Sequence, residues 1–122
     1  MNIQVERKEK FNIICVGEEK LMSSNIKDLK ETILNPEYAE VRNLIIDLTA
    51  TKYVDSSGLS AILLGYKTSK ARRGKMVLCG CQAGVMNLIK ISQLESILIC
   101  VPTIEEARDY IMMAELENDI TG

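Results

Sequence analysis

Two hydroxyls, a carboxylate and a glycine stand together in the segment Asp55-Ser56-Ser57-Gly58. An apolar run, residues 44–48, precedes this segment, and a run with helical periodicity, residues 59–71, follows it. The segment should therefore lie where a helix begins, and the free backbone N–H groups at that point favour negative charge. These residue types in this place predict a surface on which a serine can carry a phosphate group.

Each of these four residues also has a structural interpretation. Ser56 either accepts a phosphate or merely caps the helix, because serine is a frequent cap. Ser57 is a competing acceptor or the cap itself, whereas Asp55 caps the helix, contacts a partner or orients a serine hydroxyl. Gly58 either lets the backbone of another protein approach closely or is an ordinary glycine at a helix start. Taken by themselves, the residues favour the capping role of Ser56.

The chain has no histidine, and that absence limits the kinds of catalysis that it could perform. It excludes Ser–His–Asp and Cys–His catalysis and most metal enzymes. The sequence also has no Gly-x-x-x-x-Gly-Lys loop to hold a nucleotide phosphate. The pair Cys79-Gly80-Cys81 lacks a second pair or a histidine to complete a zinc site. We therefore expect a protein that is not an enzyme, with no metal and no cofactor. Its four cysteines are expected to be structural, with redox or metal-binding thiols as the alternative.

Asp47 is a second acidic candidate, because it ends a strand-like run and so resembles the phosphoacceptor of response-regulator receiver domains. A receiver domain would also need an acidic pair after its first strand to hold Mg²⁺, and a lysine directly before a late proline. In this chain Val101 precedes Pro102, and a hairpin opens the sequence. We therefore expect Asp47 to lie at the edge of the sheet and to hydrogen-bond the loop from Thr49 to Asp55.

The composition is typical of one soluble globular domain. The 122 residues are 47% hydrophobic and 26% charged, with a net charge of −2. Acidic and basic residues are interleaved, so we expect no binding to nucleic acid or to acidic lipid, and the basic run from Lys67 to Lys75 fits the solvated face of a helix. No apolar run approaches the roughly 20 residues that span a bilayer, and residues 1–8 lack the apolar core of a signal peptide. These features predict a cytoplasmic protein with no membrane partner.

Hydrophobic periodicity divides the chain into strands and helices. The expected strands lie at residues 2–8, 11–16, 41–48, 75–79 and 97–101. The expected helices begin near Ser23-Ser24, at Leu59, before Val85, and at the capping box Thr103-Ile104-Glu105-Glu106. After the opening hairpin, strand and helix alternate, which predicts an α/β layer with parallel strand pairs. We expect residues 1–114 to form one domain and residues 115–122 to be a polar tail that frays.

The run Tyr-Val-Asp-Ser-Ser-Gly-Leu-Ser-Ala-Ile-Leu-Leu, residues 53–64, resembles the STAS domain, the fold of bacterial anti-sigma factor antagonists. The similarity also includes Ile46-Asp47-Leu48, Gly74-Lys75-Met76-Val77-Leu78, Ile91-Ser92-Gln93-Leu94 and Pro102-Thr103-Ile104-Glu105-Glu106-Ala107, and it covers most of residues 11–113. The resemblance implies a single α/β domain with a mixed sheet of four to five strands. An N-terminal hairpin would open the sheet, and about four helices would lie chiefly on one face.

The resemblance also implies a function. In the family, a partner that is both an ATP-dependent serine kinase and an anti-sigma factor phosphorylates the serine directly after the turn aspartate. That serine is Ser56 here. The unphosphorylated chain would bind this partner and free a sigma factor, phosphorylation would end the binding, and a separate phosphatase would restore it. Asp55, Ser57 and Gly58 would shape the partner surface.

One loop departs from the family pattern. Many members carry an acidic residue in a Gly-Glu-Leu-Asp-like loop after the second strand, whereas this chain reads Gly17-Glu18-Glu19-Lys20-Leu21. Glu18 and Glu19 are the candidates to replace the aspartate on the partner surface. The alternative function is a STAS-type scaffold that binds a partner or ligand constitutively, without phosphorylation.

Overall fold

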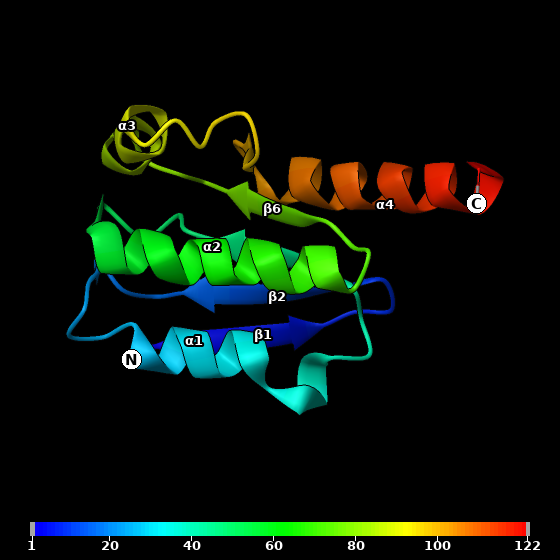
Figure 1. Cartoon of the computed structure of the whole chain (residues 1–122), viewed down its shortest axis with the longest axis horizontal. Helices are drawn as coiled ribbons and strands as arrows, with labels where there is room; N and C mark the ends of the chain where they lie inside the picture. Colours follow the sequence, from blue (N-terminus) through cyan, green and yellow to red (C-terminus); the bar gives the residue numbers. More distant parts are fainter. Residues whose placement is uncertain (1, 122) are drawn as a thin grey trace.

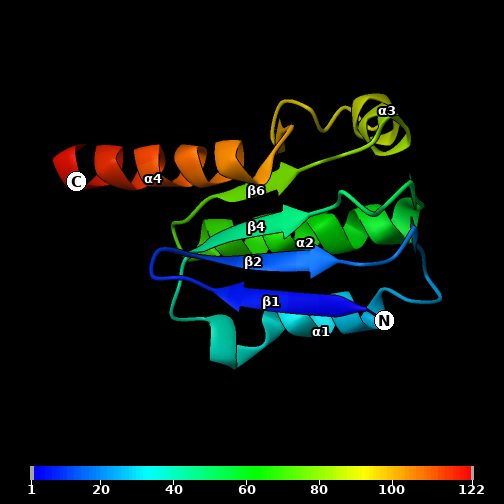
Figure 2. The same cartoon turned by 180° about the vertical axis from the view of Figure 1, so that it is seen from behind.

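The computed structural model describes residues 2–121, which form a five-stranded mixed sheet with four α-helices (Figure 1). The strands of the sheet are, in spatial order, β1 (Ile3–Arg7), β2 (Phe11–Val16), β4 (Asn43–Asp47), β6 (Met76–Cys79) and β7 (Ile99–Val101). Strand β1 runs antiparallel to β2, and all other neighbours in the sheet are parallel. The predicted opening hairpin and the parallel pairs that follow it are both confirmed (Figure 2).

Four α-helices and three short elements complete the fold. The helices are α1 (Lys27–Leu34), α2 (Ser56–Ala71), α3 (Ala83–Ile91) and α4 (Ile104–Thr121), and the short 3-10 helix η1 (Pro36–Tyr38) follows α1. Two short strands, β3 (Lys20–Leu21) and β5 (Tyr53–Val54), pair in parallel outside the main sheet. Thr103 caps α4 as the sequence predicted, because the backbone N–H of Glu106 donates to Thr103 Oγ1 at 3.2 Å. No helix among these described residues is long and apolar enough to cross a membrane.

Both faces of the sheet are covered, which explains why its central strands are apolar almost without interruption. Alternate residues of each strand point to opposite faces. Ile14, Ile46 and Leu78 are neighbours across β2, β4 and β6 and pack in one core cluster with residues of α1, α2 and α3. Their chain neighbours Ile13, Ile45 and Val77 pack on the other face with Ala107 and Ile111 of α4.

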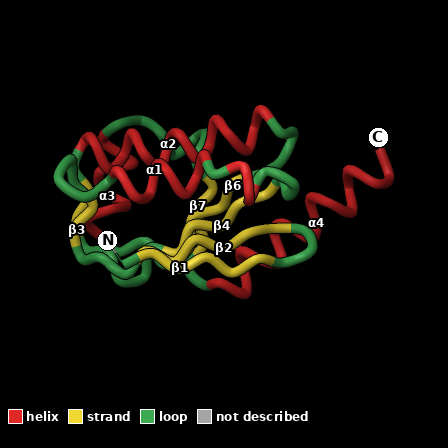
Figure 3. Tube along the Cα trace, turned by 90° about the horizontal axis from the view of Figure 1, so that it is seen from below, coloured by secondary structure: helices red, strands yellow, loops and turns green. Residues whose placement is uncertain are grey.

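Three of the four helices in the described chain therefore contribute to one core cluster and α4 to the other. Helices α1 and α2 lie side by side over the first face (Figure 3). The predicted α/β class, the mixed sheet and the helices chiefly on one face are confirmed.

The first helix begins later than the sequence predicted. Ser23-Ser24 was expected to cap it, but α1 starts at Lys27, and Ile26 stands at the cap position without a side-chain hydrogen bond. The reason is a turn made by Asn25, whose Oδ1 accepts from the N–H of Met22 at 2.8 Å and whose Nδ2 donates to Lys20 O at 2.7 Å. These bonds hold the chain in a turn for several residues before the helix can start.

The C-terminal helix extends further than the predicted domain boundary at residue 114. Helix α4 continues to Thr121, and Glu115, placed in a fraying tail by the sequence, is only 8% exposed. Its carboxylate accepts hydrogen bonds from Arg42 Nε at 3.0 Å, from Arg42 Nη2 and from Asn43 Nδ2 at 2.6 Å. Glu115 thus ties α4 to the start of β4 and belongs to the domain.

Candidate functional site

Ser56 is the first residue of α2, and its side chain is exposed. Within residues 2–121 its hydroxyl has no hydrogen-bond partner. A group attached to Ser56 would lie beside the unpaired backbone N–H groups of the first helical turn, where negative charge is favoured. Ser57, the competing acceptor, is half-buried. The structure therefore presents Ser56 to solvent more fully than its neighbour.

Asp55 is the residue that caps α2. Its Oδ1 accepts a hydrogen bond from the N–H of Gly58 at 2.8 Å, and its Oδ2 accepts one from the N–H of Ser23 at 3.3 Å. The sequence left open whether Asp55, Ser56 or Ser57 caps the helix. In the structure the cap is Asp55. The second bond also anchors the loop before α1, so that the two helix starts are held together.

Gly58 is buried, in contrast to the exposed Ser56 two residues earlier. A Cβ at this position would stand 2.3 Å from the carbonyl oxygen of Leu21 and 2.8 Å from a methyl carbon of Val54. Only glycine lets the first turn of α2 pack this closely on the β3–β5 pair. The glycine positions the helix start, and close approach of a partner's backbone is not what requires it.

The β3–β5 pair brings the other predicted residues to the same end of the molecule. Lys20 and Leu21 lie opposite Tyr53 and Val54 in parallel register. The carbonyl oxygen of Glu19 accepts from the N–H groups of Lys52 at 2.8 Å and Tyr53 at 3.0 Å. Glu18 and Glu19 are therefore brought beside the loop that leads into Ser56.

The two glutamates differ in their surroundings. Glu19 is exposed, and its carboxylate lies 3.3 Å from the ammonium group of Lys52. Glu18 is half-buried, and its carbonyl oxygen accepts from the hydroxyl of the buried Thr51 at 2.8 Å. Neither the ion pair with Lys52 nor the contact with Thr51 had a signal in the sequence, because both depend on the β3–β5 pairing.

Ser56 also lies at a groove between α1 and α2 that the sequence did not predict. The groove is lined by Lys30, Ser56, Leu59, Ser60, Leu63, Leu64 and Lys67. Lys30 belongs to α1, whereas the other lining residues belong to α2. No local pattern could place Lys30 beside Ser56, because their proximity follows from how the two helices pack.

Asp47 accepts hydrogen bonds from the loop that follows β4, as the sequence predicted. Its Oδ1 accepts hydrogen bonds from the N–H of Thr49 at 3.0 Å and from the hydroxyl of Thr49 at 2.5 Å. This confirms the prediction that Asp47 bonds the loop between residues 49 and 55. The Asp47 side chain is half-buried and lies in register with Cys15 and Cys79 on the flanking strands.

The cysteines are placed as small core residues. Cys79 is buried, and the other three are half-buried. Burial, reinforced by the nearby charge of Asp47, raises the pKa of the Cys79 thiol to about 12. A hydrogen bond with Cys100, together with burial, raises the pKa of Cys81. Among the described residues, no three His, Cys, Asp or Glu side chains are placed to hold a metal ion.

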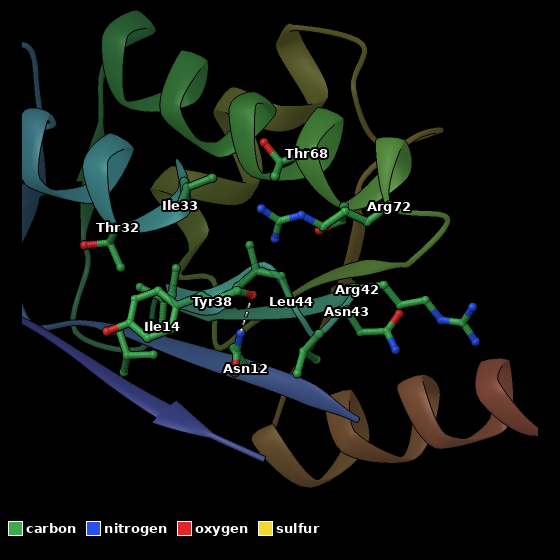
Figure 4. A pocket seen from close by; sticks show the side chains of 13 residues that line it. Asn12, Ile14, Thr32, Ile33, Tyr38, Arg42, Asn43, Leu44, Thr68 and Arg72 are labelled. Atoms are coloured by element: carbon green, nitrogen blue, oxygen red, sulfur yellow. Dashed lines mark hydrogen bonds between the residues drawn. The ribbon is translucent and has the colours of Figure 1, made fainter. Parts of the chain in front are cut away.

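A separate small cavity lies at the other end of α2, near Thr68 and Arg72 (Figure 4). The buried Asn12 lines it, and Asn12 Nδ2 donates to the carbonyl oxygen of Tyr38 at 3.2 Å. Asn12 Oδ1 has no hydrogen-bond partner among the described residues. The enclosed space is on the order of a single water molecule. This cavity lies away from Ser56 and is not part of the candidate site.

Comparison with known proteins identifies the same family that the motif at residues 53–64 indicated. The STAS domain matches residues 2–107. The anti-sigma-B factor antagonist of Listeria monocytogenes serovar 1/2a is 30% identical over 102 residues, which cover 80% of this chain and 88% of the relative.

Solved structures show the same fold. The anti-sigma factor antagonist SpoIIAA in its unphosphorylated form has a TM-score of 0.75 at 20% identity, with 91% of this chain and 96% of that chain covered. The phosphorylated form of SpoIIAA, a cell fate determinant of Bacillus, has a TM-score of 0.70 at 20% identity, with 90% of this chain and 99% of that chain covered. The resemblance first indicated by residues 53–64 is thereby confirmed.

Proposed function

This chain belongs to the STAS domain family, and on that premise we propose that it is an anti-sigma factor antagonist switched by phosphorylation. In its unphosphorylated form it binds an anti-sigma factor that is also a serine kinase, and phosphorylation of Ser56 ends the binding. The single observation that carries this proposal is the position of Ser56, exposed at the first turn of a capped helix. The protein acts by binding and performs no catalysis itself.

The position of Ser56 supports a switch that changes affinity without changing the fold. A phosphate there would gain about 0.3–1 kcal/mol from the helix dipole, so it would not destabilise its own domain. It would add a charge of roughly −1.5 to −2 to the surface. That charge acts on a bound partner, through repulsion of acidic groups and through the cost of burying a dianion in an interface.

The partner surface in this proposal is built from the residues around Ser56. Asp55 and Ser57 flank the acceptor, and Glu18 and Glu19 lie on the neighbouring loop joined to it by the β3–β5 pair. Gly58 contributes by setting the position of the helix start. A separate phosphatase removes the phosphate and restores binding.

The proposal is tested with the kinase that the unphosphorylated chain retains from its native cell extract. The purified kinase and labelled ATP are added to the wild-type chain and to the matched variants Ser56→Ala and Ser57→Ala, and the label is mapped by mass spectrometry. We expect labelling of wild type and Ser57→Ala but not of Ser56→Ala. Label on Ser57 alone, or none on the wild type, contradicts the proposal.

Affinity measurements complete the test. Ser56→Ala should bind the kinase as tightly as the wild type, and Ser56→Asp should bind more weakly, because the carboxylate imitates part of the phosphate charge. Equal affinity of the phosphorylated and unphosphorylated chains would instead favour the alternative, a scaffold that binds its partner constitutively.

A further inference from the structure

The groove beside Ser56 combines apolar and cationic side chains. Leu59, Leu63 and Leu64 supply apolar lining, and Lys30 and Lys67 supply positive charge from its two walls. Ser56 and Lys67 are separated by about 17 Å along the axis of α2, at 1.5 Å per residue. The groove therefore has room for several residues of another protein chain.

The two lysines of the groove differ from other lysines on the same helices. Lys27 of α1 lies 3.9 Å from a carboxylate oxygen of Glu31, and the Lys70 ammonium lies over the ring of Tyr66 at 5.7 Å. By contrast, neither Lys30 nor Lys67 forms an ion pair within the described chain. Their charge is available to a partner. A partner that matches this surface carries carboxylates beside apolar side chains.

We propose that the groove between α1 and α2 binds an acidic, amphipathic segment of the partner kinase, with the carboxylates of that segment facing Lys30 and Lys67. This inference rests on the proposed function and specifies the chemistry of the partner surface. The apolar side chains of the segment cover Leu59, Leu63 and Leu64, and the lysines fix its position and speed its association.

The groove also suggests how a phosphate on Ser56 acts on a bound partner. Ser56 lines the same groove as the two lysines, so a phosphate there adds negative charge to the surface that carries them. The added charge of roughly −1.5 to −2 is about equal and opposite to that of Lys30 and Lys67 together. Phosphorylation thus brings the net charge of the groove close to zero, which weakens its attraction for an acidic segment, and it repels the nearest carboxylate.

The experiment compares two double variants with the same change in net charge. Lys30→Glu/Lys67→Glu reverses the charge of the groove. Lys8→Glu/Lys75→Glu is the control, because both residues are exposed, Lys8 directly after β1 and Lys75 directly before β6. The end of β1 and the start of β6 lie at the opposite end of the sheet from the start of α2 (Figure 1). Binding of the purified kinase to the unphosphorylated forms is measured by surface plasmon resonance at about 50 mM and about 500 mM NaCl. Circular dichroism checks that each variant is folded.

We expect the groove variant to associate with the kinase at least about tenfold more slowly than the control variant at low salt. At high salt the difference should shrink, because salt screens the charges. If the groove and control variants bind equally well while the wild type still responds to phosphorylation, the inference is overturned and the proposed function stands. If the wild type binds no kinase, the proposed function itself fails.

Sedimentation of the chain without kinase tests another occupant of the groove. We expect the wild type and the groove variant to sediment alike. If the wild type self-associates and the groove variant does not, the groove binds a second copy of this chain, and the assignment to the kinase is wrong.

Discussion

The carboxylate of Asp55 caps the helix that presents the phosphorylation candidate, because its Oδ1 accepts a hydrogen bond from the N–H of Gly58 at 2.8 Å. Replacing Asp55 with alanine should lower the free energy of unfolding by about 1 kcal/mol, as is usual for the loss of an N-cap. Asp55→Asn keeps an oxygen acceptor and should lose clearly less. Urea denaturation at pH 7 measures both. If the two variants were equally unstable, the charge of Asp55 rather than its capping bond would be what stabilises the helix.

Gly58→Ala tests the close packing of α2 on the β3–β5 pair. The new Cβ would stand 2.3 Å from the carbonyl oxygen of Leu21, and backbone at that distance must shift. We expect a loss of about 1–3 kcal/mol in the free energy of unfolding. Ser60→Ala, at an exposed position two residues further along the same helix, is the control and should stay within about 0.5 kcal/mol of the wild type. A stable Gly58→Ala variant would contradict the assigned role of this glycine.

Ser56→Asp tests whether negative charge at the start of α2 is compatible with the fold. The carboxylate would lie at the positive end of the helix dipole, so we expect stability equal to the wild type or higher by about 0.3–1 kcal/mol. Thermal unfolding followed by circular dichroism gives the comparison. Ser60→Asp, one turn away from the helix start, should gain less. Marked destabilisation by Ser56→Asp would mean that phosphorylation acts by unfolding the domain and not by changing a surface.

The ion pair of Glu115 with Arg42 predicts a specific dependence of stability on pH. The hydrogen bond from Arg42 lowers the pKa of Glu115 below its ordinary value. A carboxylate whose pKa is lowered on folding stabilises the protein above the pKa of the unfolded state, and this contribution is lost as the pH falls through the pKa of the folded state. The wild type should therefore lose stability relative to Glu115→Gln when the pH falls below about 4.3.

Denaturant titrations of both proteins between neutral and acid pH provide this measurement. At neutral pH, Glu115→Gln should be less stable by about 2 kcal/mol, because it weakens charge-assisted bonds to Arg42 and Asn43. A gap between the two proteins that stays constant with pH would mean that Glu115 does not titrate in this way.

Cys79 should be unreactive in the folded protein. Its pKa is raised to about 12 by burial and by the charge of Asp47, so almost none of it is thiolate at pH 8. Treatment with a thiol-specific reagent at pH 8, followed by peptide mapping, should leave Cys79 unlabelled in the native protein and labelled in urea. Fast labelling of Cys79 without denaturant would show that β6 opens readily or that the thiol is less buried than the structure indicates.

Local patterns in the sequence were sufficient to predict the main sheet and its helices. The opening hairpin, the buried strands and the helix cap formed by Thr103 all depend on residues close together in the chain. The start of α1 was misplaced because Asn25 forms a turn that competes with capping by Ser23 and Ser24. The end of α4 was misplaced because residues 115–121 look polar, and the burial of Glu115 depends on Arg42, 73 residues away in the chain.

The candidate site was only partly predictable, because several of its contacts join residues that are far apart in the chain. Local patterns alone predicted that Asp55, Ser56, Ser57 and Gly58 lie at the start of a helix after a buried strand, because capping and periodicity are local properties of the chain. The folded arrangement was needed to show that Asp55 is the cap and that Gly58 packs against Leu21. Packing also brought Glu18, Glu19 and Lys30 to the same end of the molecule as Ser56. These relationships join segments far apart in sequence, and no short pattern encodes them, because they arise from the packing of helices and strands against a shared core.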